Sequence, residues 1–254
     1  MVYATYSTGF RPGGNNRISA ALGQTQAKPP FVADTLTNYE IGWKTSWLDH
    51  SLRVNGAVFW ENWNKIQYSL PGLLGIYYTL NAGDARSRGI EGDVSWTIAH
   101  HLTLSASGTY VDAKLTTPFL ATNKDGSKSV AAPKGTRLPV QPKLKINATA
   151  RYDFETGTLK DFVQGSVNHQ SGTLSYLTTA GEDVLGPTKG FTTFDFSAGT
   201  AFGNTTLSIF IQNAFDKRGI LSKNSVCTPG ICGAFARLYP IKPQLFGIKL
   251  GEKF

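Results

Sequence analysis

Apolar and polar side chains alternate with a period of two along most of this chain. Between Lys143 and Phe154, the even positions are apolar or small and the odd positions are polar or charged. Successive side chains of a strand point to opposite faces, so this pattern predicts a strand with one apolar and one polar face. The same alternation appears at residues 39–47, 52–60, 90–98, 102–110, 194–202, 206–212 and 246–254. The sequence therefore predicts an all-β chain of about ten antiparallel strands.

The connections between these strands alternate in length. Short links are expected at residues 48–50, 99–101, 155–160 and 203–204, and long ones near residues 11–34, 67–76, 114–142, 177–190 and 217–238. Up-and-down strands place every short link at one end of the sheet and every long link at the other. This arrangement is typical of a transmembrane β-barrel, with short periplasmic turns and long extracellular loops.

A soluble β-sandwich is the alternative, because it also alternates and also uses hairpins. Long connections without regular structure, as expected here, are uncommon in compact soluble domains. Aromatic residues also gather near both predicted strand ends, as they do at the two interfaces of a membrane. The turn end has Trp47, Trp96, Tyr152, Phe154 and Phe202, and the loop end has Trp60, Tyr68 and Tyr110. These two observations favour the barrel.

Composition narrows the choice of fold. Of the 254 residues, 41% are hydrophobic and only 17% are charged, which argues against a disordered chain. The sequence is poor in helix formers, and no apolar run approaches the roughly 18 residues of a membrane-spanning helix. The chain is therefore either soluble or meets a membrane as strands.

Several segments resemble, in the same order, those of TonB-dependent outer-membrane receptors. They are residues 3–14 (YATYSTGFRPGG), 36–44 (LTNYEIGWK), 81–91 (NAGDARSRGIE), 138–144 (LPVQPKL), 212–217 (QNAFDK) and the terminal Phe254. The resemblance extends over essentially the whole chain. It implies an outer-membrane receptor of a Gram-negative bacterium, for TonB-dependent uptake of a scarce ligand such as a ferric siderophore. A free-standing ten-stranded pore or adhesin is the alternative function.

The resemblance also implies a domain organisation. Receptors of this family have more strands than the ten expected here, and they enclose an N-terminal plug. Residues 1–254 are therefore expected to be the C-terminal part of the barrel, with the plug and the N-terminal strands absent. The TonB energy-transducing complex would act only through the missing plug. The barrel assembly machinery would recognise a C-terminal signal that consists of Phe246, Ile248, Leu250 and Phe254.

No set of residues predicts catalysis or a resident cofactor. An outer-membrane protease would need a histidine and paired carboxylates at the outer rim. Here His50, His100 and His101 fall in the short turns, and His169 is expected in mid-strand. The adjacent pair His100–His101 is also a poor metal site, because neighbouring residues in a tight turn seldom direct both rings at one ion. We expect no enzyme and no metal.

The net charge of +8 is concentrated in two long loops. One holds six basic residues against Asp125, and the other holds five basic residues and no acid. Nucleic acid is a poor explanation, since no binding motif accompanies the charge. Three interpretations stay open: attraction of an anionic ligand such as a ferric chelate, contact with lipopolysaccharide phosphates, and plain solvation. The candidates for ligand steering are Lys124, Lys128, Lys134, Arg137, Lys223 and Arg237.

Arg86 and Arg88 form a separate candidate site. They occupy alternate positions with the apolar Ile90, so their side chains share its parity and point to the same face of the strand. We therefore expect them on the lipid-facing side, just above the membrane zone. Guanidinium groups bind phosphates through paired hydrogen bonds. These two residues are therefore candidates for contact with lipopolysaccharide.

Cys227 and Cys232 are predicted to form a disulfide at a loop tip. A Pro-Gly turn between them would bring them within bonding range, and the cell surface is oxidising. Free thiols or a metal site are the alternatives. Non-reducing peptide mass mapping of protein from the outer membrane should recover the two cysteines in one linked peptide. Two freely alkylatable thiols would contradict the prediction, and a bond to another chain would indicate an interface.

Overall fold

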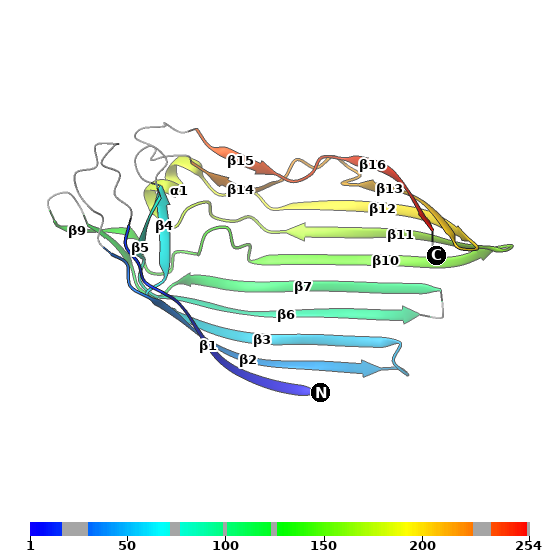
Figure 1. The fold of residues 1–254 in the computed structure, drawn as a ribbon, viewed down its shortest axis with the longest axis horizontal. Helices are drawn as coiled ribbons and strands as arrows, with labels where there is room; N and C mark the ends of the chain where they lie inside the picture. Colours follow the sequence, from blue (N-terminus) through cyan, green and yellow to red (C-terminus); the bar gives the residue numbers. More distant parts are fainter. Residues whose placement is uncertain (17–29, 72–76, 99–100, 123–125, 226–234, 253–254) are drawn as a thin grey trace.

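The computed structural model describes residues 1–16, 30–71, 77–98, 101–122, 126–225 and 235–252. Ten strands form one antiparallel sheet in the order β1-β2-β3-β6-β7-β10-β11-β12-β13-β16, which confirms the predicted strand number (Figure 1). They are β1 (Val2–Arg11), β2 (Asp34–Trp47), β3 (Leu52–Asn64), β6 (Ala85–Ile98), β7 (Leu102–Leu115), β10 (Leu144–Thr156), β11 (Leu159–Gln170), β12 (Phe191–Phe202), β13 (Thr205–Gln212) and β16 (Leu245–Glu252). Among the described strands, β1 and β16 each pair with one neighbour, so the sheet is open at both edges.

The two kinds of connection separate to opposite ends of the sheet, as predicted. In Figure 1 the short turns lie on the right and the longer connections on the left. The turn between β10 and β11 is tighter than expected, because the strands continue to Thr156 and Leu159. Gly157 in that turn has a φ of 67°, a left-handed conformation that glycine adopts without strain.

The strand register places most of the large apolar residues of the sheet on one face; Phe59, Phe162 and Phe210 are exceptions on the other face. One cross-strand row runs from Ile41 through Val58, Ile90 and Tyr110 to Leu144. These side chains are not buried against protein: Ile41 is 60% exposed, and Leu250 on β16 is 72% exposed. A continuous apolar face of this size needs apolar surroundings. We therefore call it the outward, lipid-facing side, and the polar face the inward side.

Aromatic residues mark both edges of the outward face. Tyr39 and Trp47 lie at the two edges on β2, and Phe194 and Phe202 lie eight positions apart in the same way on β12. Eight strand residues span about 26 Å along the strand. At the strand tilt of a membrane barrel this projects to roughly 20 Å, somewhat less than the apolar band of such barrels, which is about 25 Å tall. Trp96, Tyr152 and the other aromatic residues predicted at the turn end also face outward.

Four of the five long connections contain regular structure among the described residues, so for these four the expectation of structureless loops was wrong. They form three hairpins and one short helix: β4 (Gln67–Pro71) with β5 (Tyr77–Asn81), β8 (Phe119–Thr122) with β9 (Lys128–Ala132), β14 (Ile220–Asn224) with β15 (Arg237–Pro240), and α1 (Thr179–Leu185). The side chain of Thr178 caps α1 by accepting a hydrogen bond from the Gly181 N–H. In the part of the chain that is described, no helix has the length and apolar character to cross a membrane.

A hydrophobic core lies among these connections and the loop ends of β6 and β7. It consists of Ile66, Ala82, Ala85, Leu115, Phe119, Ala132 and Leu177, which we call the loop core. Tyr68 packs against it, so the prediction that Tyr68 belongs to the outer aromatic girdle was wrong. Its hydroxyl accepts a hydrogen bond of 3.1 Å from the Leu177 N–H, and burial raises the pKa of Tyr68 to about 12.

Asp34 ties the loop core to the top of the sheet. Its carboxylate is 1% exposed and accepts hydrogen bonds from the Arg11 guanidinium, the Trp63 indole (3.0 Å) and the Gln67 N–H (3.1 Å). Burial opposes ionisation, but Arg11 and the hydrogen bonds outweigh it and lower the pKa of Asp34. One side chain thus joins β1, β2, β3 and β4.

The outward face predicts how the membrane form responds to charge. Ile248→Arg should destabilise the protein in a bilayer by about 2–4 kcal/mol. Ile248 pairs with Ile209 and through it with Ala198, midway between Phe194 and Phe202, so the cation would lie near the middle of the apolar band. Lys249→Ala is the control, because Lys249 faces inward, and it should have little effect. Folding into liposomes during urea titration measures both. Equal tolerance of the two changes would contradict the assigned faces.

The Asp34 network predicts a local loss of stability. Asp34→Ala leaves three donors without their acceptor and should cost about 2 kcal/mol, seen as faster amide exchange at Gln67. Glu155→Ala, at the exposed turn end of β10, should stay within about 0.5 kcal/mol. Because the pKa of Asp34 is lowered, its stabilisation should be complete above the ordinary value of 3.8 and disappear as the pH falls below it. Unchanged exchange at Gln67 in Asp34→Ala would refute this role.

Candidate functional site

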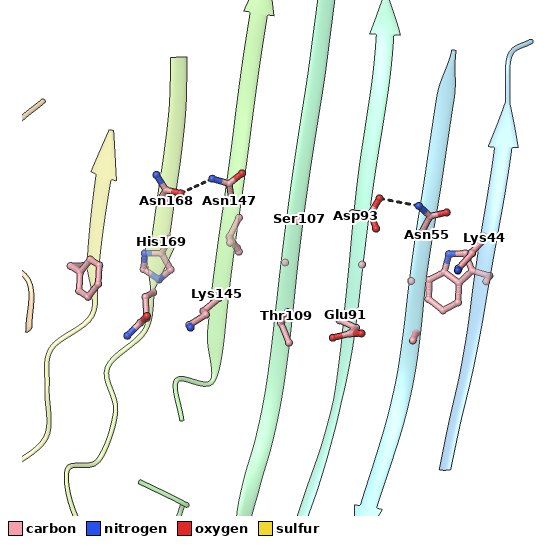
Figure 2. A pocket seen from close by; sticks show the side chains of 18 of the residues that line it. Lys44, Asn55, Glu91, Asp93, Ser107, Thr109, Lys145, Asn147, Asn168 and His169 are labelled. Atoms are coloured by element: carbon pink, nitrogen blue, oxygen red, sulfur yellow. Dashed lines mark hydrogen bonds between the residues drawn. The ribbon is translucent and has the colours of Figure 1, made fainter. Parts of the chain in front are cut away.

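The inward face of the sheet carries a belt of polar side chains. Asn55 donates to Asp93 (3.0 Å), and Asn147 donates to Asn168 (2.5 Å), as Figure 2 shows. Asn168 in turn donates to Asp195 over 3.0 Å. These residues come from β3, β6, β10, β11 and β12. Four of them, Asn55, Asp93, Asn147 and Asn168, line a hollow of about 700 Å³.

The charges on this face are of both signs. Lys44, Glu91 and Lys145 line the same hollow (Figure 2), and Glu40 accepts a hydrogen bond of 2.9 Å from the Tyr3 hydroxyl. Neighbouring opposite charges and amides can satisfy one another or bind water. The wall therefore suits repeated weak contacts with polar partners rather than one tight binding site.

A second hollow lies among the connections at the loop end. It has a volume of about 1030 Å³ and lies between the hairpins β4–β5 and β8–β9 and the helix α1. Tyr78, Phe119, Tyr176 and Leu185 are among the residues that line it. The Glu182 carboxylate fixes α1 beside it by accepting the N–H groups of Ser175 (2.8 Å) and Tyr176 (3.0 Å). Sequence reasoning missed this cavity, because it depends on how separate connections pack.

The predicted steering residues fall into two groups. Lys128, Lys134 and Arg237 have exposed side chains at the loop end. Arg137 and Lys223 are instead bound to backbone carbonyl groups. The Arg137 guanidinium donates to the carbonyls of Gln141 and Gly172, and the Lys223 ammonium donates to those of Leu185 and Pro187. Lys124 lies outside the described residues. The three exposed cations are the better candidates for steering.

Arg86 and Arg88 lie on the outward face, at the height of the outer aromatic girdle. Their guanidinium groups lie 4.7 and 5.5 Å from the centre of the Trp60 ring. Asp112 is 3.5 Å from Arg88 and 3.0 Å from Lys114. Sequence reasoning did not assign Asp112 and Lys114 to this site, although they share parity with the outward-facing Tyr110.

The three histidines that the structure describes lie apart from one another. His50 contacts Ser46, His101 contacts the Asp153 carbonyl, and His169 contacts Thr192. His169 is one residue before the end of β11, so its predicted mid-strand position was wrong. Within the described ranges, no three His, Cys, Asp or Glu residues are grouped closely enough to hold a metal ion.

The remaining predicted sites are only partly described. Phe246, Ile248 and Leu250 of the predicted assembly signal are exposed on the outward face of β16. Phe254, His100 and both cysteines, Cys227 and Cys232, lie outside the described residues.

Comparison with known sequences identifies relatives of this chain. The metal-pseudopaline receptor CntO of Pseudomonas aeruginosa is 27% identical over 219 residues, which cover 85% of this chain and 27% of that protein. The pesticin receptor of Yersinia enterocolitica is 26% identical over 230 residues, which cover 85% of this chain and 29% of that protein. The chain thus spans little more than a quarter of the length of these relatives.

Solved structures show the same fold. The ferric yersiniabactin uptake receptor FyuA of Yersinia pestis matches with a TM-score of 0.71 at 21% identity, over 98% of this chain and 34% of that one. The siderophore receptor PiuA of Acinetobacter baumannii matches with a TM-score of 0.70 at 17% identity, over 98% and 33%. A sequence model described as "TonB dependent receptor-like, beta-barrel" matches residues 1–214. The chain belongs to this family of outer-membrane β-barrels of Gram-negative bacteria.

Proposed function

We propose that the protein containing this chain is a receptor for TonB-dependent uptake of a scarce ligand, such as a ferric siderophore, across the outer membrane. The observation that carries this proposal is the two-faced sheet with a packed loop core at its outer end. The outward face suits lipid, the inward face suits water, and the loop end holds a cavity large enough for a small ligand. The sequence relatives named above are receptors for metal-pseudopaline and for pesticin, and the first of these names supports a metal chelate.

This chain would supply part of the transport path. The cavity beside α1 would contact the ligand at the cell surface, and the polar belt would line the route inward. We propose that the TonB energy-transducing complex acts through a plug outside this chain, and that the barrel assembly machinery recognises β16. The family is one of transport receptors, and we accordingly propose transport rather than catalysis.

The charge of the loop end favours an anionic ligand. Lys128, Lys134 and Arg237 are exposed there, and their field would raise the local concentration of a negatively charged ferric chelate. Such attraction acts before contact, so it affects association more than dissociation.

Energy coupling provides the direct test of uptake. Cells that express the complete receptor should accumulate iron from ferric siderophores, and deletion of the TonB complex should abolish that accumulation while leaving surface binding intact. Accumulation that is equal with and without TonB would contradict the proposal and favour a passive pore.

Charge neutralisation tests the steering. In the complete receptor, the combined variant Lys128→Gln, Lys134→Gln and Arg237→Gln should slow ferric-chelate association roughly tenfold at low salt and flatten its salt dependence. Lys160→Gln, at the turn end, is the control and should leave the rate unchanged. Stopped-flow fluorescence quenching by the chelate measures the rate. An unchanged rate in the triple variant at low salt would remove the steering role.

A further inference from the structure

An outward-facing group of cations lies where the sheet leaves the membrane. It consists of Arg86, Arg88 and Lys114, arranged around the single carboxylate of Asp112, and we call it the outer basic cluster. Arg88 and Lys114 approach Asp112 to 3.5 and 3.0 Å. In the described part of the chain, Arg86 has no ion pair. It is held instead by Trp60, whose ring centre is 4.7 Å from its guanidinium.

The register explains why these side chains converge. Trp60, Arg88 and Asp112 form one cross-strand row on β3, β6 and β7. Arg86 pairs with Lys114 in the next outward-facing row, about 7 Å further from the membrane. All five side chains have the parity of Ile90 and Tyr110, which belong to the apolar face. The outer basic cluster therefore faces the lipid side of the wall rather than the transport path.

The charges of this cluster do not balance. Two cations, Arg88 and Lys114, share the Asp112 carboxylate, and Arg86 adds a third positive charge beside them at the height of the outer aromatic girdle. A net positive charge at such an interface is unfavourable unless an anion accompanies it. Guanidinium and ammonium groups that converge at this depth match the phosphates of a lipid headgroup, which lie at the same height.

A second group of cations lies beside the first. Arg137 forms an isolated β-bridge with Lys114, and the Lys143 ammonium also acts electrostatically on Asp112. Arg137 and Lys143 line a small hollow of about 320 Å³ together with Ser171 and Thr188. Their positive charge adds to the field of the outer basic cluster, which favours a headgroup with two phosphates over one with a single phosphate.

We propose that the outer basic cluster binds the phosphates of lipopolysaccharide in the outer leaflet. Trp60 supports the cluster by stacking under the two arginines, and Asp112 holds Arg88 and Lys114 in position. This lipid site is separate from the proposed ligand path. The proposal of a lipid site therefore does not depend on the proposed uptake function.

The test uses the complete receptor, purified in detergent and stripped of lipid. The probes are lipid A with two phosphates, lipid A with one phosphate, and phosphatidylglycerol vesicles. The combined variant Arg86→Gln, Arg88→Gln and Lys114→Gln should bind the two-phosphate lipid A on the order of a hundredfold more weakly than the wild type. The wild type should prefer the probes in the order given, and native mass spectrometry measures the bound lipid.

A matched variant separates this site from general charge effects. The control is the combined variant Arg53→Gln, Lys160→Gln and Lys249→Gln, which removes three cations from the inward face and the turn end. It should bind lipid A as tightly as the wild type does. A β-sheet circular dichroism spectrum and a melting temperature equal to those of the wild type confirm that the outer-cluster variant is folded. Equal binding of lipid A by the outer-cluster variant and the wild type would overturn the proposal. Equal affinity of the wild type for phosphatidylglycerol would overturn the assignment to lipopolysaccharide.

Discussion

The structure depends on one constraint: backbone N–H and C=O groups in hydrocarbon must find their hydrogen bonds within the protein. The long antiparallel pairings meet it, and they also fix the register. Once the register is fixed, a shift by one residue would exchange the two faces of a strand. The row from Ile41 to Leu144 and the inward belt from Asn55 to Asp195 follow from this single choice. At the two open edges, β1 and β16 still offer unpaired backbone groups.

The sheet itself was predictable because its signal is local. Alternation along a strand needs no knowledge of its neighbours, so Lys143–Phe154 could be assigned to β10 from the sequence alone, within one residue at its start and two at its end. The outward position of Arg86 and Arg88 followed from parity with Ile90 in the same way. Their partners, Asp112 and Lys114, lie on the next strand, and the cluster appears only when the register of β6 against β7 is known.

The loop end was less predictable because its structure comes from distant contacts. Tyr68 looks like a girdle residue from its place near a strand end, but its hydroxyl meets the Leu177 N–H, 109 positions along the chain. Asp34 gives no signal in the sequence, yet it accepts hydrogen bonds from β1, β3 and β4. Basic residues that look equivalent in the sequence have different environments in the structure. Lys223 is bound to carbonyl groups, whereas Lys128 is exposed. The cavity beside α1 arises from the same long-range packing.

The most direct test of the two-faced wall is a spin-label scan of β10, residues 144–154, in the complete receptor in a lipid bilayer. Collision rates with oxygen, which concentrates in lipid, and with a water-soluble nickel chelate should alternate with a period of two. The account predicts oxygen maxima at even positions such as Ile146 and Ala148, and lower oxygen collision at odd positions such as Asn147. Absence of the alternation, or the opposite phase, would contradict it.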